Sequence, residues 1–178
     1  MPELPEVETI VRGLHNHLVG FTINSVDLQR KDLRFPIPKT LNKSIIGKKI
    51  TNIHRRGKYI VISNEANQTI LMHLGMSGRI KIRQINSKKD KHDHVIMKLN
   101  NNNEIVFNDP RRFGMIDLIN RNNFENHRCI KSLGPEPLGS AFNESYVADY
   151  LSSKKSSIKS VLLNQKFVAG LGNIYVCE

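Results

Sequence analysis

The feature that most restricts the fold of this chain is a series of short β-type segments between residues 21 and 119. Eight such segments follow one another without a helical pattern between them, and asparagine- and glycine-containing turn signals separate them. The expected strands are residues 22–28, 49–53, 59–63, 69–73, 79–83, 94–99, 104–107 and 115–119. Consecutive short strands of this kind predict a two-sheet β-sandwich or a flattened barrel.

Helical patterns lie on both sides of this β region. Apolar residues at positions 7, 10, 11, 14 and 18 predict an N-terminal helix over residues 5–18. After residue 120, Asn143 is the expected N-cap of one helix, and Ser156 or Ser157 that of another. The predicted fold class is therefore α+β. We expect a domain of residues 1–132 with the N-terminal helix and the sandwich, then a stiff connection and an all-helical module over residues 133–178.

The charge of the chain indicates the kind of partner it binds. Its 27 Lys and Arg residues outnumber its 16 Asp and Glu residues, which gives a net charge of +11 and a pI near 9.8. Such an excess predicts an acidic polymer or an anionic surface as partner, although a solubility bias or association with ribosomes would give the same balance. The chain has no tryptophan and only 6% aromatic residues, which argues against a single-strand binder with many stacking platforms.

Cysteine usage and hydropathy point to a cytoplasmic compartment. Cys129 and Cys177 lie far apart without metal-ligand spacing, so they fit a reducing compartment and exclude a self-contained zinc finger. We recognise no signal peptide and no membrane-spanning apolar run. The final residues, 173–178, read as a helix that has just begun, so we expect a truncated chain.

The N-terminus offers a nucleophile. Removal of Met1 would leave Pro2 with a free secondary amine, whose pKa near ~8 is well below the ~10.4 of a lysine side chain. An uncharged secondary amine that attacks a sugar or carbonyl carbon gives a cationic iminium directly, and Glu3 is placed to move the protons. The alternative is a frayed terminus that begins an ordinary helix.

Several interior positions combine reactive or basic side chains with turn residues. Lys58 directly precedes an apolar strand, so it is either a snorkelling edge residue or a functional group. Met76 lies between glycines in a loop, where a core position is less expected. His92 and His94 share a strand face and suggest a metal site, but we prefer one histidine on a polar face and one paired with Asp93.

Three further segments suit a nucleic acid. The loop 108–114 projects Arg111 and Phe113, a planar cation and an apolar wedge that suit filling a gap in a base stack; a surface loop with a partly buried Phe113 is the alternative. Residues 153–157 include Lys155 and suit a phosphate, or are merely solvated charges. Gly170-Leu-Gly-Asn173 precedes a helix, and its glycines permit close backbone approach to a phosphate.

Taken together, these segments resemble the bacterial formamidopyrimidine-DNA glycosylases, which excise oxidised purines. The resemblance runs from residue 2 to the end of the chain. Each segment alone is weak, but they occur in the order of the family, and the sister endonuclease VIII family lacks the Pro2-Glu-Leu-Pro form. The matching segments are residues 2–8 (PELPEVE), 56–58 (RGK), 73–78 (HLGMSG), 91–94 (KHDH), 109–114 (DPRRFG), 133–138 (LGPEPL) and 170–175 (GLGNIY).

The resemblance implies a β-sandwich and a helix–two-turn–helix module with duplex DNA bound between them. It implies excision of 8-oxoguanine and formamidopyrimidines, followed by strand cleavage through β,δ-elimination, by a monomer in the nucleoid of the bacterial cytoplasm. The implied catalytic residues are Pro2 as nucleophile, Glu3 for proton transfer, Glu6 for ordering the site and Lys58 for phosphate contact and elimination. The implied DNA-binding residues are Met76, Arg111 and Phe113 in the space of the flipped base, and His92, Lys155 and Asn173 on phosphates, with Lys154 the weaker match to the family's lysine.

The family also carries one structural zinc in a C-terminal four-cysteine finger, and this chain contains no counterpart of that finger. We therefore expect no metal or cofactor in this chain. Two alternatives stay open: an impaired or non-catalytic duplex-binding fragment of the same family, and a small-molecule enzyme that uses the terminal proline as a base, as tautomerases do. The charge excess and the loop 109–114 argue against the second.

Overall fold

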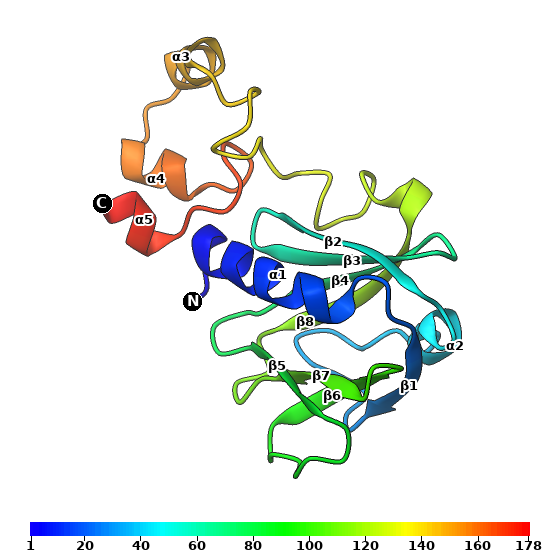
Figure 1. Cartoon of the computed structure of the whole chain (residues 1–178). Helices are drawn as coiled ribbons and strands as arrows, with labels where there is room; N and C mark the ends of the chain where they lie inside the picture. Colours follow the sequence, from blue (N-terminus) through cyan, green and yellow to red (C-terminus); the bar gives the residue numbers. More distant parts are fainter.

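The computed structural model describes all 178 residues and shows an α+β protein (Figure 1). Helix α1 (Leu4–Leu18) precedes two four-stranded antiparallel sheets, and a helical region follows them. The first sheet has the order β1 (Ile23–Leu28), β6 (Asp93–Leu99), β7 (Asn103–Asn108) and β5 (Arg79–Gln84). The second has the order β2 (Ile50–Arg56), β3 (Tyr59–Asn64), β4 (Gln68–His73) and β8 (Met115–Asn120). All eight predicted strands are confirmed. Of the two predicted arrangements, a two-sheet sandwich and a flattened barrel, the structure has the two-sheet sandwich.

The two sheets and α1 share one core. A cluster of 23 buried apolar residues takes side chains from both sheets and from the inner face of α1. Helix α1 lies along β2 and contributes Val7, Val11, Leu14 and Leu18 to this cluster. Each fully buried side chain of this size contributes about 1.5–3 kcal/mol to folding. The N-terminus is therefore attached to a packed helix and does not fray freely.

Two short helical elements were not predicted from the sequence. Helix α2 (Leu41–Ile45) and the 3-10 helix η1 (Arg121–Asn123) are five and three residues long. Segments this short hold too few apolar positions to show a helical period. Helix α2 lies in the connection between β1 and β2, and η1 directly follows β8, the last strand.

The region after β8 is helical, as predicted. Helix α3 (Glu144–Ser152) is capped by Asn143, whose Oδ1 accepts a hydrogen bond from the amide of Tyr146 at 3.0 Å. Ser157, not Ser156, caps α4 (Ile158–Leu163), and α5 (Asn173–Cys177) follows Gly172. Val161, Phe167 and Val168 form a separate small core beneath these helices. No helix of the structure combines the length and apolarity needed to cross a membrane.

Candidate active site between the sandwich and the helical region

The buried carboxylate of Glu3 joins the N-terminus to the helical region. Its side chain accepts hydrogen bonds from the amides of Gly172 (2.6 Å), Ile174 (2.9 Å) and Tyr175 (3.4 Å), at the start of α5. Glu3 is only 2% exposed, and the amide of Leu4 donates to the carbonyl of Gly170 at 3.1 Å. In Figure 1 the N-terminal end of α1 lies beside α5. Residues 169 to 172 positions apart in the chain thus form one site.

Glu6 orders the same terminus from within α1. Its Oε2 accepts a hydrogen bond from the amide of Glu3 at 2.9 Å, and its Oε1 accepts one from the hydroxyl of Tyr175 at 3.2 Å. Pro2 precedes this pair and is only half-buried. Pro2 therefore directly precedes a residue whose backbone amide and side-chain carboxylate are both fixed by hydrogen bonds.

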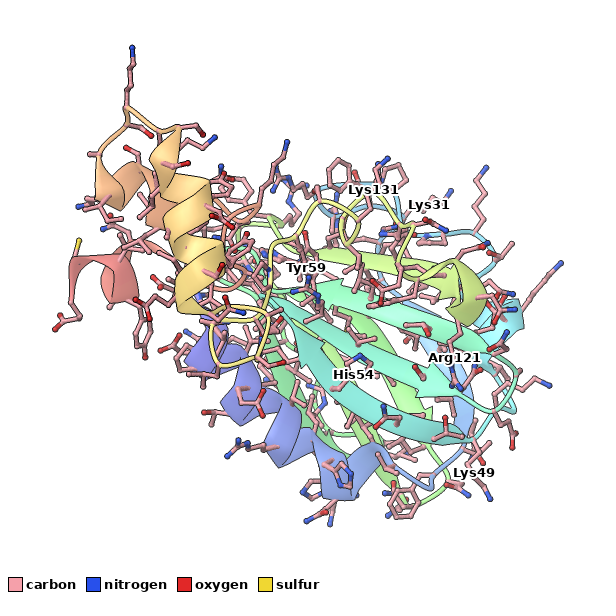
Figure 2. The ribbon with its side chains drawn as sticks, turned by 90° about the horizontal axis from the view of Figure 1, so that it is seen from above. Lys31, Lys49, His54, Tyr59, Arg121 and Lys131 are labelled. Carbon is pink, nitrogen blue, oxygen red and sulfur yellow. The ribbon has the colours of Figure 1, made fainter.

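Lys58 lies in the turn between β2 and β3 and is buried, with 8% of the residue exposed. Burial lowers the pKa of its amine, and the nearby charge of Glu3 opposes that shift. Figure 2 shows the next residue, Tyr59, at the end of the sheet that faces the helical region. A lysine whose pKa is lowered transfers protons more readily near neutral pH than a solvated one.

Glu136, in the connection to the helical region, fixes the turn that carries Lys58. Its carboxylate accepts hydrogen bonds from the amide of Gly57 at 2.6 Å, from Arg56 at 2.9 Å and from Arg55. Arg56 also donates to the carbonyls of Leu133 and Gly134, at 3.2 and 2.8 Å. Burial alone would raise the pKa of Glu136, but these hydrogen bonds outweigh it and lower the pKa.

We expect Glu136→Gln to lower the free energy of unfolding by about 2 kcal/mol at pH 7, because it leaves two arginines partly buried without their carboxylate. The pKa of Glu136 lies below its ordinary 4.5, so its contribution is present above pH 4.5 and is lost as the pH falls through the folded-state pKa. Urea unfolding across pH 3–7 measures both effects. The exposed Glu125→Gln is the control, and a wild-type-to-variant difference that does not shrink at acid pH would contradict the assignment.

A cavity opens beside the N-terminus. One hollow of about 410 Å³ is lined by Met1, Lys58 and His73 among others, and an adjoining one of about 440 Å³ is lined by Met1, His73 and Met76. Phe113 borders both hollows. Burial and the positive charges of Lys58 and Arg34 lower the pKa of His73 to about 4, so its ring is neutral at pH 7. Met1, Lys58, Met76 and Phe113 therefore border two adjoining hollows.

Two loops beside these hollows carry the residues expected to fill a gap in the base stack, which we call the wedge residues: Met76, Arg111 and Phe113. Met76 is 47% exposed and Phe113 is 46% exposed, and the Arg111 guanidinium stacks over the Phe113 ring at 4.7 Å. Gly75 has φ +61°, and a Cβ there would lie 2.4 Å from the carbonyl carbon of Phe113. The two loops can pack this closely only because residue 75 is a glycine. The structure thus brings together Met76, Arg111 and Phe113, as the sequence analysis expected.

Asp109 holds the second loop from inside. Its carboxylate is fully buried and accepts hydrogen bonds from Ser77 Oγ at 2.6 Å and from the amide of Gly114 at 2.8 Å. His94 is bonded through Nε2 to the carbonyl of Asp109 at 2.8 Å. The predicted pairing of a histidine with Asp93 is therefore wrong, because Asp93 is already held by Arg83 and Asn108.

The three residues expected on phosphates come from different parts of the surface. His92 is half-buried and directly precedes β6, and Asn173 is the exposed first residue of α5. Lys155 is exposed between α3 and α4, whereas Lys154 lies over the ring of Tyr150 at 4.6 Å. That contact occupies Lys154 and leaves Lys155 the freer of the two. Their contact with DNA stays a prediction.

The residues of this chain do not fit the structural zinc that the family carries in its four-cysteine finger. No three His, Cys, Asp or Glu side chains lie close enough together to hold a metal ion. Cys129 is half-buried and contacts Met115, whereas Cys177 is exposed in α5. A four-cysteine site cannot be assembled from them.

The fold and the site define a two-part protein whose N-terminus lies at the contact between a β-sandwich and a helical region. Comparison with known families matches residues 1–116 to the formamidopyrimidine-DNA glycosylase N-terminal domain and residues 133–178 to the formamidopyrimidine-DNA glycosylase H2TH domain. The chain belongs to the formamidopyrimidine-DNA glycosylase family. The helical region is accordingly the helix–two-turn–helix region of that family.

Individual relatives agree with this assignment. The chain is 45% identical over 186 residues to the formamidopyrimidine-DNA glycosylase of Roseobacter denitrificans and 46% identical over 187 residues to that of Dinoroseobacter shibae. Each match covers 100% of this chain and 66% of the relative, so the chain spans just under two thirds of their length.

Solved structures of the Lactococcus lactis enzyme give the same result. One is non-covalently bound to DNA with an AP site, with a TM-score of 0.90 and 35% identity over 98% of this chain and 66% of that one. Another is a complex with DNA that contains N7-benzyl-Fapy-dG, with a TM-score of 0.91 and 36% identity over 98% of this chain and 65% of that one. Both structures hold damaged DNA.

Proposed function

We propose that the protein is a bifunctional DNA glycosylase and AP lyase that excises oxidised purines, such as 8-oxoguanine and formamidopyrimidines, from duplex DNA. The observation that carries the proposal is that the N-terminus, Lys58 and the wedge residues Met76 and Phe113 border adjoining hollows. A nucleophile, a proton-transfer group and side chains that replace a base are the parts that base excision from a duplex requires. Membership of the family and the damaged DNA in the related structures support it.

The proposed reaction starts at the amine of Pro2 after removal of Met1. The unprotonated nitrogen attacks C1′ of the damaged nucleotide, the glycosidic bond breaks, and the base leaves with a proton. The prolyl nitrogen loses its proton and its lone pair then expels O4′ from C1′, while O4′ takes a proton. The ring-opened sugar is thereby held by Pro2 as an iminium. Loss of the proton on C2′ expels the 3′-phosphate, a second elimination expels the 5′-phosphate, and water releases the sugar from Pro2.

The neighbouring side chains receive separate roles in this proposal. Glu3 transfers protons to and from the sugar, fixed there by the amides of Gly172 and Ile174. Glu6 fixes the backbone of the N-terminus by accepting a hydrogen bond from the amide of Glu3. Lys58 holds the adjacent phosphate and assists β-elimination. Arg111 faces the orphaned partner base, with Phe113 and Met76 in the emptied space.

The DNA would lie across both parts of the molecule. His92 on the sandwich and Lys155 and Asn173 on the helical region would hold phosphates, and the division between the two parts would fall at residues 132 and 133. The net charge of +11 suits binding to the phosphate backbone of DNA, which is a polyanion. We expect a monomer in the bacterial cytoplasm at the nucleoid, without a cofactor of its own.

Borohydride trapping on duplex with 8-oxoguanine tests the proposal. The expected result is a covalent protein–DNA adduct and, without borohydride, cleavage of the lesion strand. The second candidate is a duplex-binding protein of the same family without catalysis, which the net charge of +11 and the matched H2TH domain would also support. Salt-dependent duplex binding with neither an adduct nor strand cleavage would overturn the enzyme proposal in its favour.

Lys58→Ala is expected to slow excision of 8-oxoguanine by about 10²-fold while a pre-formed abasic site is still trapped, because the prolyl amine remains in place. Single-turnover excision and trapping on the two substrates measure the two steps separately. Lys43→Ala, on the exposed side of α2, is the control for loss of one positive charge. Unchanged excision by Lys58→Ala would contradict the role given to this lysine.

A further inference from the structure

The outer face of the second sheet is polar at the end that lies away from the candidate active site. Alternate residues of β2, β3 and β4 belong to the sandwich core, so the residues between them point to the outer face. The cross-strand pairs Asn52–Ser63 and Ser63–Thr69 form one row of this face. Val61 in the next row already belongs to a small apolar cluster with Ile130. The outer face is therefore apolar and covered at one end, and polar at the other.

A hollow of about 510 Å³ lies over the polar row. Only two of its nine lining residues are hydrophobic, and it shares none of the nine with the two hollows beside the N-terminus. In Figure 2, which looks onto this sheet, Arg121 lies farther from the helical region than Tyr59. The lining residues are Thr51, Asn52, His54, Val61, Ser63, Thr69, Arg121, Phe124 and Glu125. This hollow is thus separate from the proposed catalytic site.

The wall of the hollow contains hydrogen-bond donors that the protein leaves without acceptors. Ser63 and Thr69 are 5% and 1% exposed, and their hydroxyls bond to each other at 3.2 Å. Each hydroxyl carries one hydrogen, so this single bond leaves one O–H of the pair free. Arg121 donates through Nη2 to Thr51 Oγ1 at 3.3 Å and to the carbonyl of Asn64 at 2.9 Å, and its remaining N–H groups make no hydrogen bond within the protein. A ligand rich in acceptors would satisfy these groups.

The charge of the hollow comes mainly from Arg121, which forms no ion pair. Partial burial of the His54 ring and the charge of Arg121 lower the pKa of His54, so the guanidinium acts on the same space as the imidazole. Glu125 is the only acidic residue of the lining, and it is exposed, where water and salt screen its charge. The rings of His54 and Phe124 meet edge to face, with centroids 6.3 Å apart, and add an aromatic wall. The hollow therefore suits an anion that carries an organic part.

We propose that this hollow binds the phosphate group of a small ligand, with Arg121 and the Ser63–Thr69 hydroxyls as donors to the phosphate oxygens. A guanidinium matches the geometry of a phosphate through two parallel N–H bonds. Inorganic phosphate and a mononucleotide share this chemistry, and 510 Å³ leaves room for a sugar and a base against Phe124. The site goes beyond the proposed glycosylase function, because none of its residues takes part in that reaction.

NMR titration of the whole chain at pH 7 without DNA tests the site. Inorganic phosphate and dAMP are added in turn, and the ring signals of His54, assigned with His54→Gln, are expected to move. Arg121→Gln should weaken binding about 10-fold, because a hydrogen bond between charged groups is lost. The double variant Ser63→Ala with Thr69→Val should also weaken it about 10-fold. This variant should fold normally, because it removes both members of a buried hydroxyl pair and leaves neither unpaired.

Two charge variants complete the test. Lys49→Gln removes one exposed positive charge outside the lining and should keep the wild-type affinity. Glu125→Gln removes the opposing charge and should tighten binding about 3-fold. Tighter binding of dAMP than of phosphate would identify a nucleotide as the ligand, and equal binding would identify the free anion. Unmoved His54 signals with both ligands would overturn the site, as would equal affinities of the wild type and Arg121→Gln. Because no DNA is present, either result leaves the glycosylase proposal to its own trapping test.

Discussion

Protein that retains Met1 is expected to form no borohydride adduct with lesion-containing duplex. With Met1 attached, the nitrogen of Pro2 is part of a tertiary amide, which has no free lone pair for attack on C1′. Met1 itself borders the two hollows beside Lys58 and would also obstruct the sugar. Removal of a covalent nucleophile costs about 10⁴–10⁶ in rate. Expression with methionine aminopeptidase inhibited, followed by trapping and gel electrophoresis, measures the effect.

Pro2→Gly gives a second form of the same test. Its primary amine would have to gain a proton to become a cationic iminium, and it lacks the ring that fixes the backbone before Glu3. The trapped yield is expected to fall to near background, while affinity for duplex that contains a stable abasic analogue is retained. An adduct that persists in the Met1-retaining protein would rule out the proline as nucleophile.

Gly172→Ala should strongly slow excision, through a residue of the helical region that contacts Glu3. A Cβ at residue 172 would lie 2.4 Å from Cδ of Glu3 and 2.5 Å from its Oε1. The backbone of Gly172 has φ −128°, which alanine adopts freely, so the effect comes from displacement of the carboxylate and not from strain. Glu3 is 2% exposed and has no space to withdraw. A displacement of about 1 Å at reacting groups costs about 10² in rate.

Single-turnover excision of 8-oxoguanine measures this loss, and trapping on a pre-formed abasic site shows whether the prolyl amine survives. The control is Gly13→Ala in α1, where an added Cβ meets no atom within 4 Å. That variant should excise normally and be as stable as the wild type or up to about 1 kcal/mol more stable. Excision at the wild-type rate by Gly172→Ala would contradict the role given to Glu3.

The fold was predictable where the pattern of residues is local. The strands of the sandwich were recognisable from their β-branched residues and turn signals, and α1 from its apolar period. Helix α2 was missed because it is a single turn, and the cap of α4 could only be narrowed to Ser156 or Ser157. The pairing of one of the two histidines with Asp93 was mispredicted, because the bond that His94 makes instead, to a backbone carbonyl 15 residues away, leaves no signal in the sequence.

The site was predictable only in part. Its reactive residues belong to recognisable segments, but the distant residues that hold them in place through hydrogen bonds do not. Pro2, Glu3 and Lys58 were expected on chemical grounds and by resemblance. The hydrogen bond from Gly57 to Glu136 spans 79 residues, and that from Gly172 to Glu3 spans 169. Contacts across such separations appear only when the chain is folded.

The most direct test of the account is the identity of the residue that holds the sugar. The borohydride-trapped complex on 8-oxoguanine duplex is digested with nuclease and protease, and the modified peptide is sequenced by mass spectrometry. The account predicts that the sugar is attached to the nitrogen of Pro2, in a peptide that has lost Met1. Attachment to Lys58, or to any other lysine, would contradict it.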